Sequence, residues 1–175
     1  MSATFLASTT GWSNVGGVLG ARSLSDDDVW RMLAHQIAPG AEYNSPERQP
    51  FPMCLPGTRV KALDTLETVL TQTDRKVVWF FGGPGSGKSS IAYSIADRLR
   101  SQNRLAATFF FSRKHLNRSN TDRVFLTIGY QIGLLHHQAK SRIIRAIRHD
   151  PTLLESHKSR GDQLERLVAE PLRSL

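Results

Sequence analysis

The 175-residue chain has a single cysteine, Cys54, so it cannot form an internal disulfide. A chain without disulfides suits a reducing compartment, and we expect a cytoplasmic protein. No apolar run approaches the roughly 20 residues that a membrane span needs. The N-terminal sequence has neither the basic start nor the sustained apolar stretch of a secretory signal. Membrane attachment is therefore not expected.

Acidic residues are scarce: 15 Asp and Glu stand against 23 Lys and Arg, which gives a net charge of +8. The excess lies mostly in the second half of the chain, at Arg98, Arg100, Arg104, Arg113, Lys114, Arg118, Arg123, Arg142, Arg145 and Arg148. Such residues can follow nucleic-acid phosphates, but no recognisable nucleic-acid module accompanies them. A solvated helix face, or a surface for an acidic segment, is the simpler interpretation, and nucleic acid is not an expected partner.

Composition divides the chain into three parts. Residues 1–24 are rich in Ser, Thr and Gly, which predicts a flexible, mobile N-terminal arm. Residues 25–56 contain a short helix, opened by a capping box at Ser25, and then a Pro-rich linker. Residues 57–175 have the apolar periodicity of a folded domain, in which Thr58 is expected to cap the first helix.

A glycine-rich stretch in the middle of this domain is the clearest motif. Continuous apolar residues from Val77 to Phe81 are typical of a buried parallel strand. Four glycines follow between positions 82 and 87, and apolar residues then recur at helical spacing over 91–99. Gly82 to Ser89 fits G-x-x-x-x-G-K-[ST] in its required setting of strand, loop and helix. The stretch therefore predicts a phosphate-binding loop of the Walker A type.

The residue types of this loop suit a polyphosphate. Glycines allow the positive φ angles that turn successive N–H groups toward one anion, and the helix start adds its dipole. Lys88 is predicted to reach the β- and γ-phosphates, and Ser89 to join the shell of a Mg²⁺ ion. Ser90 is a neighbouring helix residue with a weaker claim. The predicted nucleotide-binding residues are Gly82, Gly83, Pro84, Gly85, Ser86, Gly87, Lys88, Ser89 and Ser90, and the ligand is ATP or GTP with Mg²⁺.

The predicted fold class is α/β. A second apolar run, residues 105–111, is a further strand candidate, and helical patterns follow it over 124–135, 139–148, from 151, and from 162. Strand, helix, strand, helix predicts parallel strands flanked by helices. We therefore expect the N-terminal part of a P-loop NTPase sheet. Two strands alone make a poor sheet, which suggests that part of the domain is missing.

Three segments carry a family resemblance: Cys54–Arg59, the glycine loop with the Trp79–Phe81 run before it, and Ala106–Arg113. Further matches follow at Thr127–Ile132, Arg145–Pro151 and Gln163–Leu172. Together they resemble the NACHT-type P-loop NTPase domain of fungal NLR-like (STAND) proteins, and the nephrocystin-type N-terminal domain that shares this module. The resemblance covers about residues 41–175, and within 57–175 it implies a partial NACHT-like domain.

The resemblance implies a signal-transduction ATPase or GTPase that oligomerises, in its full-length relatives, when a triphosphate is bound. It places Gly57-Thr58-Arg59 near the nucleotide base, which makes Arg59 a further candidate for nucleotide binding. The alternative for Arg59 is an ordinary residue at a helix N-terminus.

The chain departs from the family in its acidic residues. Related NTPases hold Mg²⁺ and polarise water with acids at the end of a third strand, the Walker B strand. The nearest match here, Leu167-Val168-Ala169-Glu170, lies in a helical pattern before Pro171. We therefore expect a chain truncated before the Walker B strand, with slow or absent hydrolysis and no catalytic residue of its own.

Two other functions remain open at this point: a small-molecule P-loop kinase, and a basic nucleic-acid-binding or adaptor protein with a vestigial loop. His136 and His137 diverge by about 100° on a helix and do not form a metal site by themselves. The tryptophans Trp12, Trp30 and Trp79 are spaced irregularly, so packing is their expected role.

Overall fold

The computed structural model describes residues 24–48, 53–72 and 77–175, and every regular element within these residues is helical. In chain order they are α1 (Asp26–Gln36), η1 (Pro46–Arg48), α2 (Val60–Thr71), α3 (Lys88–Ser101), η2 (Leu116–Arg118), α4 (Val124–Leu135), α5 (His137–His149), η3 (Pro151–Leu154), α6 (Arg160–Leu164), η4 (Glu165–Ala169) and α7 (Glu170–Arg173). The predicted flexible arm, apart from Leu24, lies outside the described residues.

The prediction of an α/β fold with a parallel sheet is wrong, because the described residues contain no strand. The two predicted strands, 77–81 and 105–111, run through the structure without regular hydrogen bonding. A strand needs a neighbour that exchanges N–H and C=O bonds along its length, and neither segment has one among the described residues. Both segments are apolar, as the sequence indicates, but an apolar sequence does not specify a neighbouring strand to pair with.

The second of these segments finds substitutes for a strand partner. The Gln131 side chain donates from Nε2 to the Thr108 carbonyl at 2.9 Å and accepts from the Thr108 N–H at 3.0 Å. The Phe110 N–H donates to the carbonyl of Ala41 at 2.8 Å, and the Tyr43 N–H donates to the Thr108 hydroxyl. A helix side chain and the chain after α1 therefore satisfy main-chain groups that a sheet would otherwise pair.

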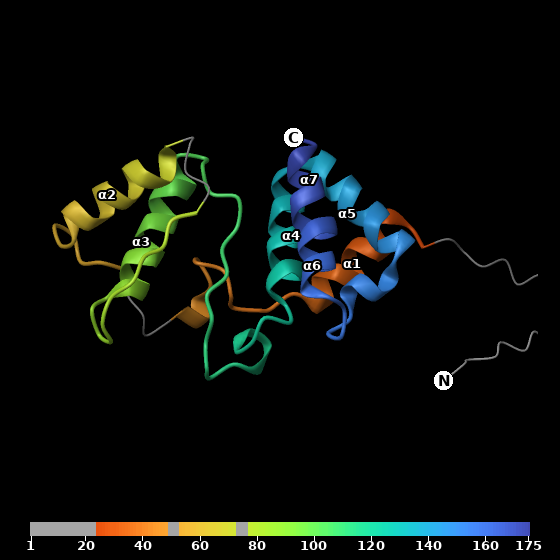
Figure 1. Cartoon of the computed structure of the whole chain (residues 1–175), viewed down its shortest axis with the longest axis horizontal. Helices are drawn as coiled ribbons and strands as arrows, with labels where there is room; N and C mark the ends of the chain where they lie inside the picture. Colours follow the sequence, from red (N-terminus) through yellow and green to blue (C-terminus); the bar gives the residue numbers. More distant parts are fainter. Residues whose placement is uncertain (1–23, 49–52, 73–76) are drawn as a thin grey trace, which may run out of the picture.

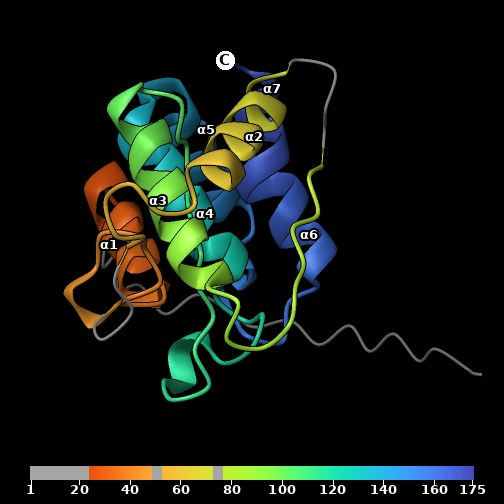
Figure 2. The ribbon, with the colours of Figure 1, turned by 90° about the vertical axis from the view of Figure 1, so that its left-hand side faces the viewer.

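The helices form two lobes (Figure 1). We call α2, α3 and residues 77–87 the loop lobe, and α1 with α4 to α7 the helical lobe. The chain at 105–112 runs between the lobes, and Figure 2 shows α2 and α3 lying in front of the helical lobe. The Tyr93 ring of α3 stacks on Phe110 with centroids 4.0 Å apart, which joins the loop lobe to this connecting chain.

The helices themselves follow the predicted pattern. Ser25 and Asp28 form the expected capping box, since each main-chain N–H donates to the other side chain at 3.1 Å. The apolar faces of α1, α4, α5 and the C-terminal helices meet in one core, made by Val29, Trp30, Leu33, Leu126, Ile132, Ala139, Ile143, Ile144, Ile147, Leu153, Leu154, Leu167 and Val168. Helical periodicity was therefore a reliable guide to the elements that pack side by side.

Glycine sets the distance between α1 and α4. A Cβ on Gly133 would lie 2.4 Å from Cη2 of Trp30, so only glycine admits the indole at this crossing. The Trp30 ring also stacks on Tyr130 at 4.9 Å between centroids, and the Lys140 ammonium lies 5.0 Å from the ring. Of the predicted packing tryptophans, Trp30 therefore lies in the core as expected.

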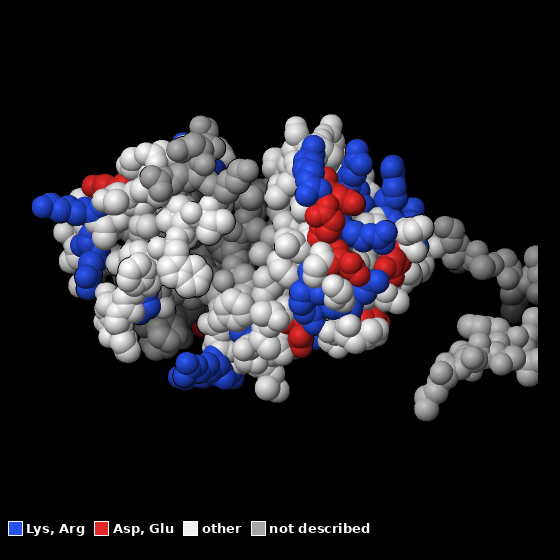
Figure 3. Space-filling view, in the orientation of Figure 1, with Lys and Arg blue, Asp and Glu red and all other residues white. Residues whose placement is uncertain are grey.

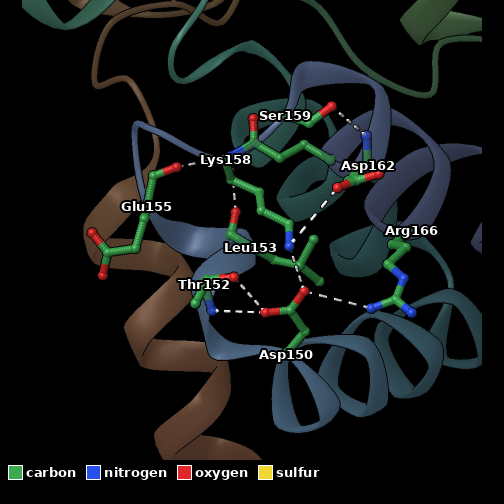
Figure 4. Close-up of polar contacts among 9 residues, drawn as sticks. Asp150, Thr152, Leu153, Glu155, Lys158, Ser159, Asp162 and Arg166 are labelled. Atoms are coloured by element: carbon green, nitrogen blue, oxygen red, sulfur yellow. Dashed lines mark hydrogen bonds and ion pairs between the residues drawn. The ribbon is translucent and has the colours of Figure 1, made fainter. Parts of the chain in front are cut away.

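Asp150 ties the end of α5 to the C-terminal helices (Figure 4). Its carboxylate accepts from Lys158 Nζ at 2.7 Å and from the Thr152 N–H at 3.1 Å, and Arg166 lies 3.7 Å away. The hydrogen bond from Lys158 is the main reason that the pKa of Asp150 is lowered to about 2. The turn between α5 and α6 is thus stabilised by an ionised carboxylate.

Candidate functional site

The glycine loop has the local geometry of an anion-binding turn. Gly85 and Gly87 have φ angles of +74° and +83°, which side-chain-bearing residues rarely adopt. Gly87 is the N-cap of α3, and the helix begins at Lys88, as the sequence predicts. The Ser86 N–H donates to the Gly83 carbonyl at 3.3 Å and closes the turn. The free N–H groups at the start of a 14-residue helix therefore open onto the loop.

The Lys88 side chain folds back over the loop. Its ammonium donates to the Gly82 carbonyl at 2.8 Å and to the Gly83 carbonyl at 2.7 Å. A Cβ on Gly82 would lie 3.1 Å from the Ser86 hydroxyl and 3.8 Å from Cδ of Lys88, so the loop is tight on its inner side. The positive charge is therefore held at the loop by two carbonyl oxygens, both of which lie on its first two residues.

The loop is open to solvent. Residues 82–85 and Ser89 are exposed, while Ser86, Gly87, Lys88 and Ser90 are half-buried. An anion in solution can therefore approach the main chain directly. Ser89 presents its hydroxyl in the first turn of α3, whereas Ser90 faces more toward the protein, in line with its weaker claim.

Arg59 lies beside the same loop. Its guanidinium Nη2 is 3.6 Å from the position that a Cβ on Gly87 would occupy. Arg59 itself is the N-cap of α2 and has a left-handed φ of +58°. Thr58, the predicted cap, instead donates its hydroxyl to the Leu55 carbonyl at 2.7 Å. The structure thus brings Arg59 and Lys88, which are far apart in sequence, to one loop.

Packing of α2 on α3 holds this arrangement. Leu63 of α2 packs against Ile91 and Ile95 of α3 in a small core. At the far end of the pair, Arg98 donates to Asp64 at 2.9 Å and to Glu67 at 3.2 Å. Hydrogen bonds from Gln102 and then Arg98 lower the pKa of Glu67. Arg59 and Lys88, at the starts of α2 and α3, are therefore held in position by apolar packing and hydrogen bonds between these two helices.

The segment that best matches a Walker B strand, residues 167–170, is helical. Leu167 and Val168 are buried in η4, and the exposed Glu170 begins α7. These elements belong to the helical lobe, whereas the glycine loop lies at the lower end of α3 in the other lobe (Figures 1 and 2). Glu170 therefore does not supply a carboxylate to the loop.

The histidines and the cysteine of the sequence do not form a metal site in the described part of the chain. His136 and His137 are exposed where α4 ends and α5 begins. Among the described residues, no group of three or more His, Cys, Asp or Glu side chains is arranged to hold a metal ion. The main chain of Cys54 is fixed by a hydrogen bond to the Ser94 hydroxyl at 2.9 Å, and the residue is half-buried.

Several of the basic residues hold elements together. Arg118 is buried, donates to the Gly40 carbonyl and pairs with Glu47 at 3.2 Å. Arg123 donates to the carbonyl of Gln36 at 2.9 Å, and Arg148 pairs with Asp26 at 2.7 Å in the same lobe. Figure 3 shows positive and negative side chains interspersed over the α5–α7 side of this face. These arginines therefore have structural roles that a count of charges does not reveal.

Trp79 is the clearest correction at residue level. Packing was its expected role, yet it is 84% exposed, and Val77 and Phe81, two residues away on either side, are exposed as well. The run from 77 to 81 was expected to be a buried strand, and its exposure follows from the missing sheet. An exposed apolar segment and a buried strand can have the same composition, so the sequence alone did not distinguish them.

Fold and loop together define a helical protein with a glycine turn at the start of α3 and two cations beside it. The family model described as nephrocystin 3, N-terminal, matches residues 58–174, and the chain belongs to this family. The expected nephrocystin-type N-terminal domain is thereby confirmed. No curated protein and no solved structure matched the chain. None of the helices in the described part of the chain is long and apolar enough to span a membrane.

Proposed function

We propose that the loop 82–90 binds the polyphosphate of ATP or GTP, as the nucleotide site of a NACHT-type signalling switch. The observation that carries this proposal is the paired left-handed glycines, Gly85 and Gly87, leading directly into the N-terminus of α3. Such a turn aims main-chain N–H groups at one point, and the helix dipole adds positive potential there. The exposure of the loop leaves this point accessible to a ligand.

Lys88 would bind the terminal phosphates. In the present structure its ammonium is held by the Gly82 and Gly83 carbonyls at 2.8 and 2.7 Å. A phosphate oxygen is a stronger partner for an ammonium group than a neutral carbonyl, because the hydrogen bond is assisted by both charges. Lys88 would therefore exchange one or both carbonyls for the β- and γ-phosphates, and Arg59 would add a second cation from the side of α2.

Ser89 is the residue that would contact Mg²⁺. Its exposed hydroxyl lies in the first turn of α3, on the residue after Lys88. Mg²⁺ in nucleotide sites takes few protein ligands and keeps phosphate oxygens and waters for the rest of its shell. A single hydroxyl is compatible with an ion that arrives with the nucleotide, and when bound the ion would neutralise phosphate charge.

Binding would not be accompanied by rapid hydrolysis. Phosphoryl transfer depends on positioning the metal and the attacking water. The nearest sequence match to an acid-bearing strand, ending at Glu170, is helical and lies in the other lobe. The protein would then act as a switch in the cytoplasm. Its response to a bound triphosphate would be assembly with other copies of itself.

Titration with fluorescent ATP and GTP analogues, in the presence of Mg²⁺, tests the proposal. Lys88→Ala is expected to weaken binding about 10- to 100-fold, because a charge-assisted hydrogen bond contributes about 1.5–3 kcal/mol. Lys114→Ala, which removes an exposed lysine away from the loop, is the matched control and should bind like the wild type. Equal affinity in the wild type and Lys88→Ala would overturn the proposal.

A further inference from the structure

A cavity lies between α5 and the chain that follows α7. Its volume is about 360 Å³, and it is lined by His137, Gln138, Ser141, Arg142, Arg145 and Ser174. All of these residues except Ser174 belong to α5, and α7 lies beside α5 in the helical lobe (Figure 1). We call this hollow the α5 cavity. Its volume is within the range of sites that bind small molecules.

The lining of the α5 cavity contains no carboxylate. It offers the guanidinium groups of Arg142 and Arg145, an imidazole and an amide, all on exposed residues. The two serine hydroxyls of the lining already donate to main-chain carbonyls, at 3.1 and 2.6 Å. Its other side chains form no hydrogen bond or ion pair with a described residue. The free groups are therefore mostly hydrogen-bond donors, which suit an anion.

The lack of an acidic partner distinguishes Arg142 and Arg145 from the other arginines of the helical lobe. Each arginine after them pairs with a carboxylate: Arg148 with Asp26, Arg160 with Asp122, Arg166 with Asp150 and Arg173 with Glu165. Arg142 and Arg145 are three residues apart on α5, where two like charges on one helix face repel each other. An anion bound by both would relieve this repulsion.

Both guanidinium groups can contact one ligand. Side chains of a helix lean toward its N-terminus, so Arg142 and Arg145 extend over the turns of α5 that carry Gln138 and Ser141. A guanidinium presents its N–H donors in a planar fork that matches two oxygens of a phosphate. A phosphate monoester has three terminal oxygens and can accept from both arginines at once. The imidazole and the amide of the lining are then available to the group that carries the phosphate.

We propose that the α5 cavity binds a phosphate monoester, with Arg142 and Arg145 on its terminal oxygens. A monoester carries a charge of about −1.5 to −2 near neutral pH, which neutralises both guanidinium groups. A carboxylate or a phosphodiester carries a single charge and would leave one guanidinium without a counter-ion. The α5 cavity shares no residue with the loop 82–90, so this site is separate from the proposed nucleotide site.

Titration of the ¹⁵N-labelled full chain with O-phosphoserine, followed by amide chemical shifts at constant ionic strength, tests the proposal. Amides of α5 are expected to shift and to saturate with a Kd of about 1 mM or lower. Acetate at the same ionic strength should bind at least about tenfold more weakly, because it carries one charge. Amides of 82–90 report separately on the proposed nucleotide site, so failure of one site is distinguishable from failure of the other.

The arginine variants test the assigned contacts. Arg142→Gln should weaken O-phosphoserine binding about tenfold, and Arg142→Gln/Arg145→Gln about 100-fold or more, because charge-assisted hydrogen bonds are lost. Glutamine preserves helix propensity at both positions. The matched control is Arg113→Gln/Lys114→Gln, which removes two exposed cations outside the cavity, with the same change in net charge, and should bind like the wild type.

A short phosphoserine peptide distinguishes two sources of the phosphate group. A peptide that binds at least about tenfold more tightly than O-phosphoserine would identify a phosphorylated protein segment as the ligand. Equal affinities would identify a small phosphate ester. Shifts confined to residues 82–90, shifts in α5 that do not saturate, or equal affinity of the wild type and Arg142→Gln/Arg145→Gln would each overturn the proposal.

Discussion

At the scale of single residues, charge placement matters more than charge number. Lys88 and Arg59 converge on the glycine loop, while Arg118 and Arg123 bind main-chain carbonyls between elements. A count of 23 basic residues does not distinguish these roles. The strained φ of Arg59 is consistent with a residue kept for its position, since a non-glycine residue in the left-handed region costs about 1–2 kcal/mol.

Asp150 carries the pH dependence at this scale. Its pKa is lowered from an ordinary value near 3.8 to about 2, chiefly by the hydrogen bond from Lys158. A carboxyl with a depressed pKa in the folded state stabilises the fold fully above its unfolded pKa, and this contribution is lost as the pH falls through 2. Asp150→Asn should therefore lower the urea midpoint at pH 7, with the difference from wild type shrinking between pH 4 and pH 2.

The control for Asp150→Asn is Asp97→Asn on the exposed face of α3, where the carboxylate forms no ion pair with a described residue. This variant should unfold like the wild type across the same pH range. Urea unfolding followed by circular dichroism at pH 2, 4 and 7 measures both. A constant difference between Asp150→Asn and the wild type at all three pH values would contradict the assigned role of the ionised carboxylate.

At the scale of elements, glycines inside α4 set the helix packing. Gly133 admits Trp30 of α1, and Gly129 admits the Leu167 carbonyl of η4, which lies 2.8 Å from the position of a Cβ. Both glycines cost helix propensity and are compensated by the close approach they permit. The helical pattern of the sequence predicts α4, but the reason for its glycines appears only when α1 and η4 are in place.

Gly133→Ala should destabilise the protein by about 1–3 kcal/mol, because the added methyl group would meet Trp30 in a packed core. Gly161→Ala is the matched control: the nearest atom is the Ser159 hydroxyl at 3.5 Å, an ordinary contact in a short exposed helix. That change should be neutral or stabilising by up to about 1 kcal/mol. Thermal unfolding compares the two variants, and equal unfolding temperatures would show that α1 does not pack as described.

At the scale of the whole molecule, the two lobes differ in the size of their cores. The cluster of buried apolar residues in the helical lobe has thirteen members, whereas the cluster between α2 and α3 has three, Leu63, Ile91 and Ile95. Each fully buried aliphatic side chain contributes about 1.5–3 kcal/mol. The helical lobe is therefore expected to be the more stable part, and the loop lobe the part that opens first.

Hydrogen exchange measured by mass spectrometry can test this difference. Amides of α4 and α5 should exchange at least about tenfold more slowly than those of α2 and α3, because the smaller core gives less resistance to local opening. Nucleotide binding at the loop would slow exchange in α3, since a ligand that binds only the folded form stabilises it. Equal protection of α3 and α5 without ligand would contradict the two-lobe description.

Sequence alone determined the helices and the local character of the loop. The capping box at Ser25, the helical periodicity of α1, α3, α4 and α5, and the glycine turn before Lys88 all follow from interactions within a few residues of each other. The same local reasoning predicted strands at 77–81 and 105–111, and failed there. A strand is completed by main-chain groups from elsewhere in the fold, and no local pattern contains them.

Only the tertiary structure determined which segments lie side by side. Packing of α2 on α3 places Arg59 beside the glycine loop. The Gln131 side chain, rather than a neighbouring strand, forms hydrogen bonds with the Thr108 main chain, and Trp79 is exposed to solvent. The physical reason is common to all three: long-range contacts depend on which surfaces meet, and the apolar periodicity of one segment does not specify the partner that will cover it.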